Sequence, residues 1–290
     1  MSSQWRCFLL KKSSRSSQLL KSGSGSQNMK TEIIYFSATG TTKAIVTAIS
    51  KGLNGKVHFT DITLPDKRKD VIAVDCDLVI IAIPVYGERI PHFLFDYIRQ
   101  IKGNGTLLAA LSVYGNMGFG ISLEQFNNFA KINNFRLIAA GAFIGQHTYA
   151  SKKAPVAFGR PDEGDIRQAE RFARSVQQKI DTCDFTCPEI PKCILPGFIT
   201  ELPDSGTRFL VRQPRIKGTS CNACGACARK CPVGAIDLKT LEINENKCLR
   251  CYACVNICPK EARTAGLRLS VFRTIFYHAG MKRKENQIFL

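Results

Sequence analysis

The stretch CNACGACARKCP, residues 221–232, places four cysteines at intervals of three, three and four residues and ends in a proline. Residues 248–259, CLRCYACVNICP, repeat this spacing. Over fifteen aligned positions, 221–235 on 248–262, the two copies share seven identities: four cysteines, the proline and two alanines. The C-terminal part of the chain is therefore an internal duplication, and the fold of that part follows from it.

The spacing predicts two [4Fe–4S] clusters. Three cysteines on one tight loop can each bind a different iron of a cubane, and in a Cys-x2-Cys-x2-Cys-x3-Cys-Pro run the fourth cysteine serves the other cluster. The predicted ligands of the first cluster are Cys221, Cys224, Cys227 and Cys258. Those of the second are Cys248, Cys251, Cys254 and Cys231. Pro232 and Pro259 end the short helices that carry the donated cysteines.

Two other interpretations of the cysteines are a disulfide scaffold and a pair of zinc sites. Structural zinc takes four ligands per site, and zinc knuckles rarely carry a third cysteine at the next interval, so the iron–sulfur interpretation is favoured. Residues 216–265 resemble a bacterial two-cluster ferredoxin.

Length and composition set the frame around this unit. The chain has 290 residues, enough for one ordinary domain and one small one. A unit of about 50 residues cannot fold on apolar burial alone, so its clusters are expected to act as its core. Five of the 13 cysteines lie outside the two runs, without a pairing pattern: Cys7, Cys76, Cys183, Cys187 and Cys193. Free thiols and thiolate ligands favour a reducing compartment, and no apolar run approaches the roughly 20 residues of a membrane span. We therefore expect a cytoplasmic protein.

The formal charge of +18 is unevenly distributed. Residues 1–30 carry +6, residues 31–181 carry +4 and residues 182–290 carry +8. The basic residues are not interleaved with aromatic ones along one element, which argues against nucleic-acid binding. An acidic redox protein, a ferredoxin or a reductase, is the expected partner, membrane-surface contact is not favoured, and a homodimer is an open alternative.

The front half alternates strands and helices. Continuous apolar runs predict strands at 30–36, 56–62, 77–83, 106–114 and 135–144. Helices are predicted within residues 38–53, where the apolar residues have helical spacing, and at 91–101, 122–132 and 162–180. Such a pattern is typical of an α/β fold with a doubly wound, five-stranded parallel sheet covered on both faces.

Ligands of doubly wound sheets bind beyond the carboxyl ends of the strands, and three loops are expected there: 37–42, 84–91 and 114–120. The first, SATGTT, is rich in hydroxyl groups and leads into a helix, which predicts a phosphate site made by backbone N–H groups. It is neither a Walker loop nor a GxGxxG loop, so it suits a single terminal phosphate. A plain N-cap turn is the alternative.

Taken together, the three loops resemble those of the flavodoxins, a resemblance that implies FMN and the sheet order 2-1-3-4-5. The phosphate loop of that family matches Ser37, Thr39, Gly40 and Thr42, with Ala38 and Thr41 between them. The segment Pro84, Val85, Tyr86 and Gly87 and the residues Tyr114, Gly115, Phe119 and Gly120 fall in the loops that flank the flavin ring in that family. Edge packing is the alternative for Tyr86. The last loop has no acidic run, in contrast to many flavodoxins.

Residues 30 to about 265 therefore resemble the flavodoxin–ferredoxin fusion proteins of anaerobes. The resemblance implies an electron-transfer protein of low-potential metabolism that couples FMN to two [4Fe–4S] clusters. Alternatives are a flavin-dependent reductase of a small molecule, such as a quinone or nitro compound, and a docking module without FMN. No catalytic residue is predicted, because His58, His92, His147 and His278 are isolated in the sequence.

The expected domains are a flavodoxin-like unit at 29–181, a Pro-rich linker at 182–215, the ferredoxin unit at 216–265 and a basic amphipathic tail at 266–290. The linker's apolar residues argue that it packs, and the tail is expected to pack on the ferredoxin unit. Residues 1–28 are rich in serine and basic, and are expected to be disordered. They resemble an organellar transit peptide, which would direct the protein to a mitochondrion-related organelle, or else an artificial leader before a true start at Met29.

Overall fold

The computed structural model describes residues 29–150, 154–194 and 207–290. Five parallel strands form the sheet of the N-terminal part, in the order β2-β1-β3-β4-β5, as the resemblance implied. Their bounds are Lys30–Tyr35 (β1), Lys56–Asp61 (β2), Leu78–Pro84 (β3), Leu107–Tyr114 (β4) and Arg136–Ile144 (β5). The predicted strands are therefore all present, with ends shifted by at most one residue.

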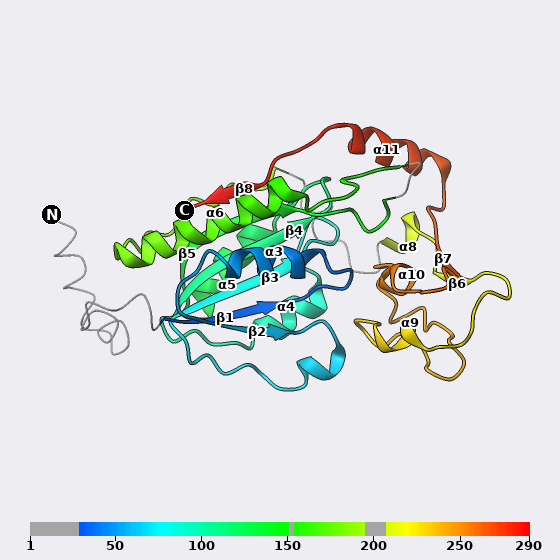
Figure 1. Ribbon diagram of the computed structural model, residues 1–290, viewed down its shortest axis with the longest axis horizontal. Helices are drawn as coiled ribbons and strands as arrows, with labels where there is room; N and C mark the ends of the chain where they lie inside the picture. The colour runs from blue at the N-terminus through cyan, green and yellow to red at the C-terminus, as the bar shows by residue number, and fades with distance from the viewer. Residues whose placement is uncertain (1–28, 151–153, 195–206) are drawn as a thin grey trace.

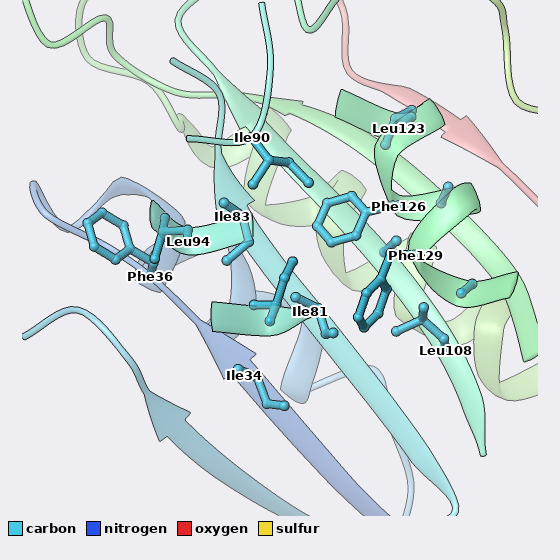
Figure 2. Close-up of a cluster of buried hydrophobic side chains, with 14 of the residues drawn as sticks. Ile34, Phe36, Ile81, Ile83, Ile90, Leu94, Leu108, Leu123, Phe126 and Phe129 are labelled. Carbon is cyan, nitrogen blue, oxygen red and sulfur yellow. The ribbon is translucent and has the colours of Figure 1, made fainter. Parts of the chain in front are cut away.

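Helices cover both faces of this sheet (Figure 1). On one face α3 (Thr41–Ser50) and α6 (Glu163–Asp181) pack against the strands, and on the other face lie α4 (His92–Ile98) and α5 (Ser122–Ile132). Successive residues of a strand point to opposite faces, so Ile33 belongs to the first core and Ile34 to the second. Figure 2 shows the second core, where Phe126 and Phe129 of α5 meet isoleucines of β3.

A sixth strand completes the sheet from the far end of the chain. β8 (Gln287–Phe289) pairs antiparallel with β5, beyond the five strands that were predicted. Asn286 fixes this return: its amide donates to Asp165 Oδ1 at 2.9 Å and its oxygen accepts from the backbone N–H of Ile144 at 2.7 Å. The prediction that the tail packs on the ferredoxin unit is therefore wrong for residues 286–289. Between them and that unit lies α11 (Ser270–Met281).

The start of the connector packs on the sheet domain. Phe185 and Ile190 lie against the two cores, whereas Ile194 is 96% exposed and does not pack as expected. The linker's other apolar residues that were expected to pack, Leu195, Phe198, Ile199 and Leu202, lie outside the described residues.

Of the cysteines outside the two runs, Cys76, Cys187 and Cys193 are free thiols, as predicted. Cys183 is disulfide-bonded, so the expectation of a free thiol is wrong there.

The C-terminal unit is built from short elements: α8 (Thr207–Leu210), β6 (Arg215–Ile216), α9 (Ala226–Arg229), α10 (Ala253–Asn256) and β7 (Arg263–Thr264). β6 and β7 pair antiparallel, and a bridge between Val211 and Leu267 extends this pairing. The apolar core of the unit is small, with Cys231, Ala235, Ile236 and Cys254 at its centre. So little apolar burial cannot hold such a fold by itself, which leaves the stabilisation to what the cysteines bind.

Among the residues described, none of the helices has the length and apolar character that crossing a membrane requires.

Candidate functional site

The first set of cysteines surrounds one cavity in the C-terminal unit. Cys221, Cys224, Cys227 and Cys258 all line it, although the fourth comes from the other copy of the repeat. Lys260 belongs to the same lining. We call this cavity the outer site.

The second set, Cys231, Cys248, Cys251 and Cys254, forms the inner site. Burial raises the pKa of the Cys254 thiol to about 12, and the neighbouring thiols of Cys251, Cys248 and Cys231 add to the shift. Burial likewise raises the pKa of Cys251 to about 12. Cys231 and Cys254 also belong to one buried cluster, and Cys248 packs against it. The crossed exchange of one cysteine between the copies is thus a feature of the folded chain.

The chemistry of both sites suits [4Fe–4S] clusters. In a cubane each sulfur binds a different iron, so the four ligands surround a cavity instead of meeting at a point. In the part of the chain that the structure describes, no three His, Cys, Asp or Glu side chains converge to hold a single metal ion. Iron also supplies the positive charge that a buried thiol needs in order to ionise.

Backbone N–H groups donate hydrogen bonds to the sulfurs of the two exchanged cysteines, Cys231 and Cys258, in the same way. Ala235 N–H donates to Cys231 Sγ and Ala262 N–H donates to Cys258 Sγ, both at 3.2 Å. Desolvation alone would raise the pKa of Cys258, but hydrogen bonds from the N–H groups of Lys260, Arg263 and Ala262 lower it. Hydrogen bonds of this kind also tune the reduction potential of a cluster.

A second cavity, a hollow of about 840 Å³ that is open to solvent, lies at the carboxyl ends of the sheet strands. The predicted binding residues that line it are Ala38, Thr39, Thr41, Thr42, Pro84, Val85, Tyr86, Gly87, Tyr114 and Gly115. Four others do not line it: Ser37, Gly40, Phe119 and Gly120. We call this hollow the sheet-edge pocket.

The loop 37–42 leads into the first residues of helix α3, Thr41 and Thr42, which line this pocket. Helix α3 begins at Thr41 after Gly40, which has φ 91° and a backbone conformation suited to glycine, and this N-cap residue makes no side-chain capping hydrogen bond. Ser37 holds the loop against the first turn of α3, since its Oγ accepts from the backbone N–H of Lys43 at 3.0 Å. The N–H groups at the start of α3 thus have the arrangement that binds a phosphate.

Phe119 and Gly120 shape the pocket indirectly. Phe119 packs edge-to-face on Tyr114, with 5.6 Å between ring centroids. Gly120 has φ 48°, and a Cβ there would come within 2.0 Å of the carbonyl oxygen of Glu88. Both residues therefore hold the loops around the pocket in place. Arg89, the next residue after Glu88, is buried as well.

A fourth loop, which sequence reasoning missed, covers the pocket. Residues 145–149 follow β5 and line the pocket. Gly145 brings this loop against the start of α3, because a Cβ at that position would lie 1.9 Å from Thr41 Cγ2. Burial lowers the pKa of His147 to about 4, and its neutral ring accepts from the N–H of Tyr149 at 3.2 Å. The sequence could have indicated this loop, since it follows β5, a strand that is parallel to the others and ends at the same edge of the sheet.

The inner site and the sheet-edge pocket share a wall. Leu249 and Cys251 of the second cysteine run line the pocket directly. Thr148 Oγ1 donates to the carbonyl oxygen of Cys251 at 2.6 Å. Tyr149 meets Tyr252 edge-to-face, with ring centroids 4.9 Å apart. Two consecutive residues of the fourth loop thus hold two consecutive residues of the inner site.

Tyr86 joins the same contact. Burial raises its pKa well above the ordinary value, with further contributions from Cys251 and Tyr149. A second contact between the two units lies elsewhere: Arg68, at the end of the 3-10 helix η2 (Pro65–Arg68), donates to the carbonyl oxygen of Pro232 at 2.6 Å. These contacts on both sides fix the C-terminal unit on the sheet domain.

Two buried arginines lie beside the cysteines. Arg250, between Cys248 and Cys251, is fully buried and pairs with Glu245 through one nitrogen at 2.5 Å. Among the described residues its Nε and Nη1 have no hydrogen-bond partner, and the same holds for Nε of the buried Arg263. Burial raises the pKa of the Cys248 thiol and Arg250 opposes this rise, whereas Arg263 adds to the lowering of the Cys258 pKa by backbone N–H groups. Each site therefore has a buried cation next to it.

Comparison with known proteins assigns both units. Residues 32–135 match the family described as Flavodoxin domain, and residues 220–262 match the family described as 4Fe-4S dicluster domain. The chain thus combines a flavodoxin domain with a dicluster ferredoxin domain. The first implies FMN as a cofactor and the second implies [4Fe–4S] clusters, which makes the chain an FMN and iron–sulfur electron-transfer protein.

Individual relatives match more weakly. Over 44 residues the chain is 46% identical to one subunit of the ion-translocating oxidoreductase complex of Methanosarcina acetivorans, a match that covers 14% of this chain and 17% of that protein. The chain thus spans about a sixth of the length of this curated relative. A solved flavodoxin from the domain Archaea is 15% identical, covers 53% of this chain and 99% of its own, and has a TM-score of 0.37. A flavone reductase is 12% identical over 55% of this chain and 66% of its own, with a TM-score of 0.42.

Proposed function

We propose that this protein passes electrons between FMN in the sheet-edge pocket and a relay of two [4Fe–4S] clusters. The observation that carries the proposal is the shared wall, because Cys251 belongs both to the inner site and to the lining of the pocket. A cluster on the inner site is then the immediate neighbour of a flavin in the pocket, and a cluster on the outer site continues the path away from it. When bound, FMN exchanges one or two electrons and each cluster exchanges one.

In this proposal the side chains of the pocket bind and orient the flavin. The loop 37–42 and the start of α3 hold its terminal phosphate, with Ser37 and Gly40 shaping the loop. Tyr86, Gly87, Tyr114 and Gly115 flank the ring. We assign to the outer cluster the four cysteines that line the outer cavity, Cys221, Cys224, Cys227 and Cys258, and to the inner cluster the other four, Cys231, Cys248, Cys251 and Cys254.

The contacts between the domains keep the donor and the acceptor at a fixed separation. Thr148 and Tyr149 hold the inner loop at Cys251 and Tyr252. No acid–base residue is required, since the transfer breaks no covalent bond. The neutral His147 is well suited to such a site, because it places no charge beside the ring.

The wider role extends the proposal. We infer an electron carrier of low-potential, anaerobic-type metabolism in the cytoplasm, which exchanges electrons with a redox protein. The cluster type and the formal charge of +18 support an acidic partner. A small-molecule reductase would need room above the flavin for a substrate. The inner cysteine loop instead forms that wall, so we favour the carrier.

A reductive titration of anaerobically purified protein tests the proposal. Uptake of about four electrons per chain is expected, two by the flavin and one by each cluster, with about eight irons per chain. Flavin and cluster absorbance should reach equilibrium with each other at every step. Absence of flavin would favour the docking module, and flavin that stays oxidised beside reduced clusters would refute the relay.

A further inference from the structure

The outer site opens onto a surface with two exposed apolar side chains. Ile216, which lines the cavity, is 39% exposed, and Leu238 is 57% exposed. Leu238 lies beside the cavity wall, because its Cδ1 is 3.0 Å from the position that a Cβ of the lining residue Gly225 would take. Figure 1 places β6 and β7, which flank this cavity, at the end of the molecule away from the sheet. The ligand Cys224 is exposed there as well.

Exposed cations surround these apolar side chains. Lys217 follows Ile216 in the chain, Lys239 follows Leu238, and Lys260 lines the cavity itself. Arg229 lies over Gly225 and donates to the carbonyl oxygen of Cys224 at 2.7 Å. Lys230 follows it. Within the described residues none of these five cations is paired with a carboxylate.

The few acids nearby do not cancel this charge. Residues 207–268 contain 12 basic and four acidic residues, so their formal charge is +8. Two oxidised clusters with their thiolates remove about four of these charges, which leaves the unit positive. Asp237, next to Leu238, accepts hydrogen bonds from the backbone N–H groups of Lys239 and Thr240 and is engaged in its own turn.

We propose that this surface, which we call the outer face and define by Ile216, Leu238, Lys217, Lys239 and Lys260, docks an acidic redox protein that exchanges electrons with the outer cluster. The proposal rests on the proposed function and adds the partner's chemistry and its place of binding. An apolar centre with a charged rim is the usual anatomy of a transient interface. Complementary charge raises the rate of association by about 10-fold to 1,000-fold and makes it fall with ionic strength.

The position of the outer face fits this role. The inner site is covered by residues 148 and 149 of the sheet domain, so a partner cannot approach it from that side. Of the two sites, as far as the chain is described, only the outer one combines exposed ligands with cations that no carboxylate pairs. Electrons therefore enter or leave through the outer site, whichever the direction of flow.

The test is stopped-flow reduction of the full-length, cofactor-loaded protein by a pre-reduced acidic [2Fe–2S] ferredoxin, whose spectrum differs from that of [4Fe–4S]. The second-order rate constant should fall at least tenfold as salt rises from about 20 to 500 mM. The double variant Lys217→Glu/Lys239→Glu should lower it about tenfold at low salt. The matched control Lys131→Glu, an exposed residue at the end of α5, should leave it unchanged.

Reduced methyl viologen, a small cation, serves as the second donor. It should reduce the double variant at least as fast as the parent protein, with flavin and clusters still equilibrating, which shows intact cofactors. Equal loss with Lys131→Glu, or a rate with the acidic ferredoxin that is independent of salt, would overturn the docking proposal while the relay stands. Binding of the outer face to vesicles of anionic lipid, with no effect of the double variant on the ferredoxin rate, would also overturn it. A flavin that methyl viologen cannot reduce through the clusters would overturn the proposed function itself.

Discussion

The two copies of the cysteine run share their spacing but face different surroundings. In the outer copy the carbonyl oxygen of Cys224 accepts from Arg229 of the same loop, at 2.7 Å. At the equivalent position of the inner copy, Cys251 accepts from Thr148 of the flavodoxin domain, at 2.6 Å. The two cysteine loops have the same spacing, yet the donor to this carbonyl oxygen comes from the same loop in the outer copy and from the flavodoxin domain in the inner copy. The two sites share a repeated sequence, and they differ because only the inner one contacts the flavodoxin domain through its cysteine loop.

The residues between the cysteines carry this difference. Leu249 lines the sheet-edge pocket where the outer copy has Asn222. Tyr252 adopts φ 56° where the outer copy has Gly225 at φ 71°, so a tyrosine occupies a left-handed conformation that favours glycine. The cost is of order 1–3 kcal/mol, offset here by packing on Tyr149 and by hydrogen bonds to the carbonyl oxygens of residues 212 and 266.

Substitution of Cys231 or Cys258, the cysteine that each run donates to the other site, should have the largest effect and should distinguish the two sites. Cys231→Ala should remove the inner cluster, lower the iron content by about half and abolish transfer to the flavin, because Cys231 belongs to the inner set. Cys258→Ala is the matched exchange and should damage the outer cluster. Iron analysis and EPR of the reduced variants distinguish the two. Loss of the outer cluster in Cys231→Ala would refute the crossed ligation.

The phosphate loop gives the next largest effect. Thr39→Glu places a carboxylate at the start of α3 and should weaken FMN binding at least 100-fold, about 2.7 kcal/mol, through repulsion of the phosphate. Both clusters should keep their spectra, since neither site includes this loop. Thr47→Glu, an exposed position in α3, is the control. Unchanged flavin content in Thr39→Glu would mean that the loop is only a structural turn.

Much of this arrangement was predictable from sequence because its signals are local. The strand order followed from the resemblance of three loops, and the spacing of the cysteines led to the four that line the outer cavity. The strand β8 was not predictable, since Gln287–Phe289 is too short to stand out from its surroundings. Nor was the fourth loop recognised: His147 and Tyr149 carry no motif, and their role depends on a partner loop about 100 residues away. Contacts between distant segments leave no periodic pattern to read.

Acid should destabilise the fold through His147, which lies in the loop that contacts the inner cysteine run. The pKa of His147 is about 4 in the folded protein against 6.5 for an ordinary histidine, so between these values the unfolded chain binds a proton that the folded chain does not. This contribution to stability is therefore fully present above pH 6.5 and is lost as the pH falls towards 4, by about 3 kcal/mol in total. Denaturant unfolding between pH 4 and 7 measures the slope. A His147→Gln variant with the same slope would show that this histidine is not responsible.

The buried Arg250 should raise the midpoint potential of the inner cluster. Arg250 stands where the outer copy has Ala223, and its nitrogens that lack partners among the described residues stabilise added negative charge on the inner cluster. Arg250→Gln should lower the inner midpoint potential by about 50 mV, close to a tenfold change for one electron, and leave the outer one nearly unchanged. Arg250→Lys should retain most of the effect, and Lys247→Gln is the exposed control. EPR-monitored redox titration reads both clusters, and equal shifts in the two would contradict the assignment.

The central claim is that electrons pass between the flavin and the inner cluster within one chain. Rapid reduction of the clusters by methyl viologen, followed at the flavin absorbance over a wide range of protein concentrations, tests it most directly. The account predicts a flavin reduction phase whose rate is independent of protein concentration, slowed by Thr148→Val because that variant removes the hydrogen bond to Cys251. A rate that rises linearly with protein concentration would mean that the two carriers merely share a chain, and would contradict the account.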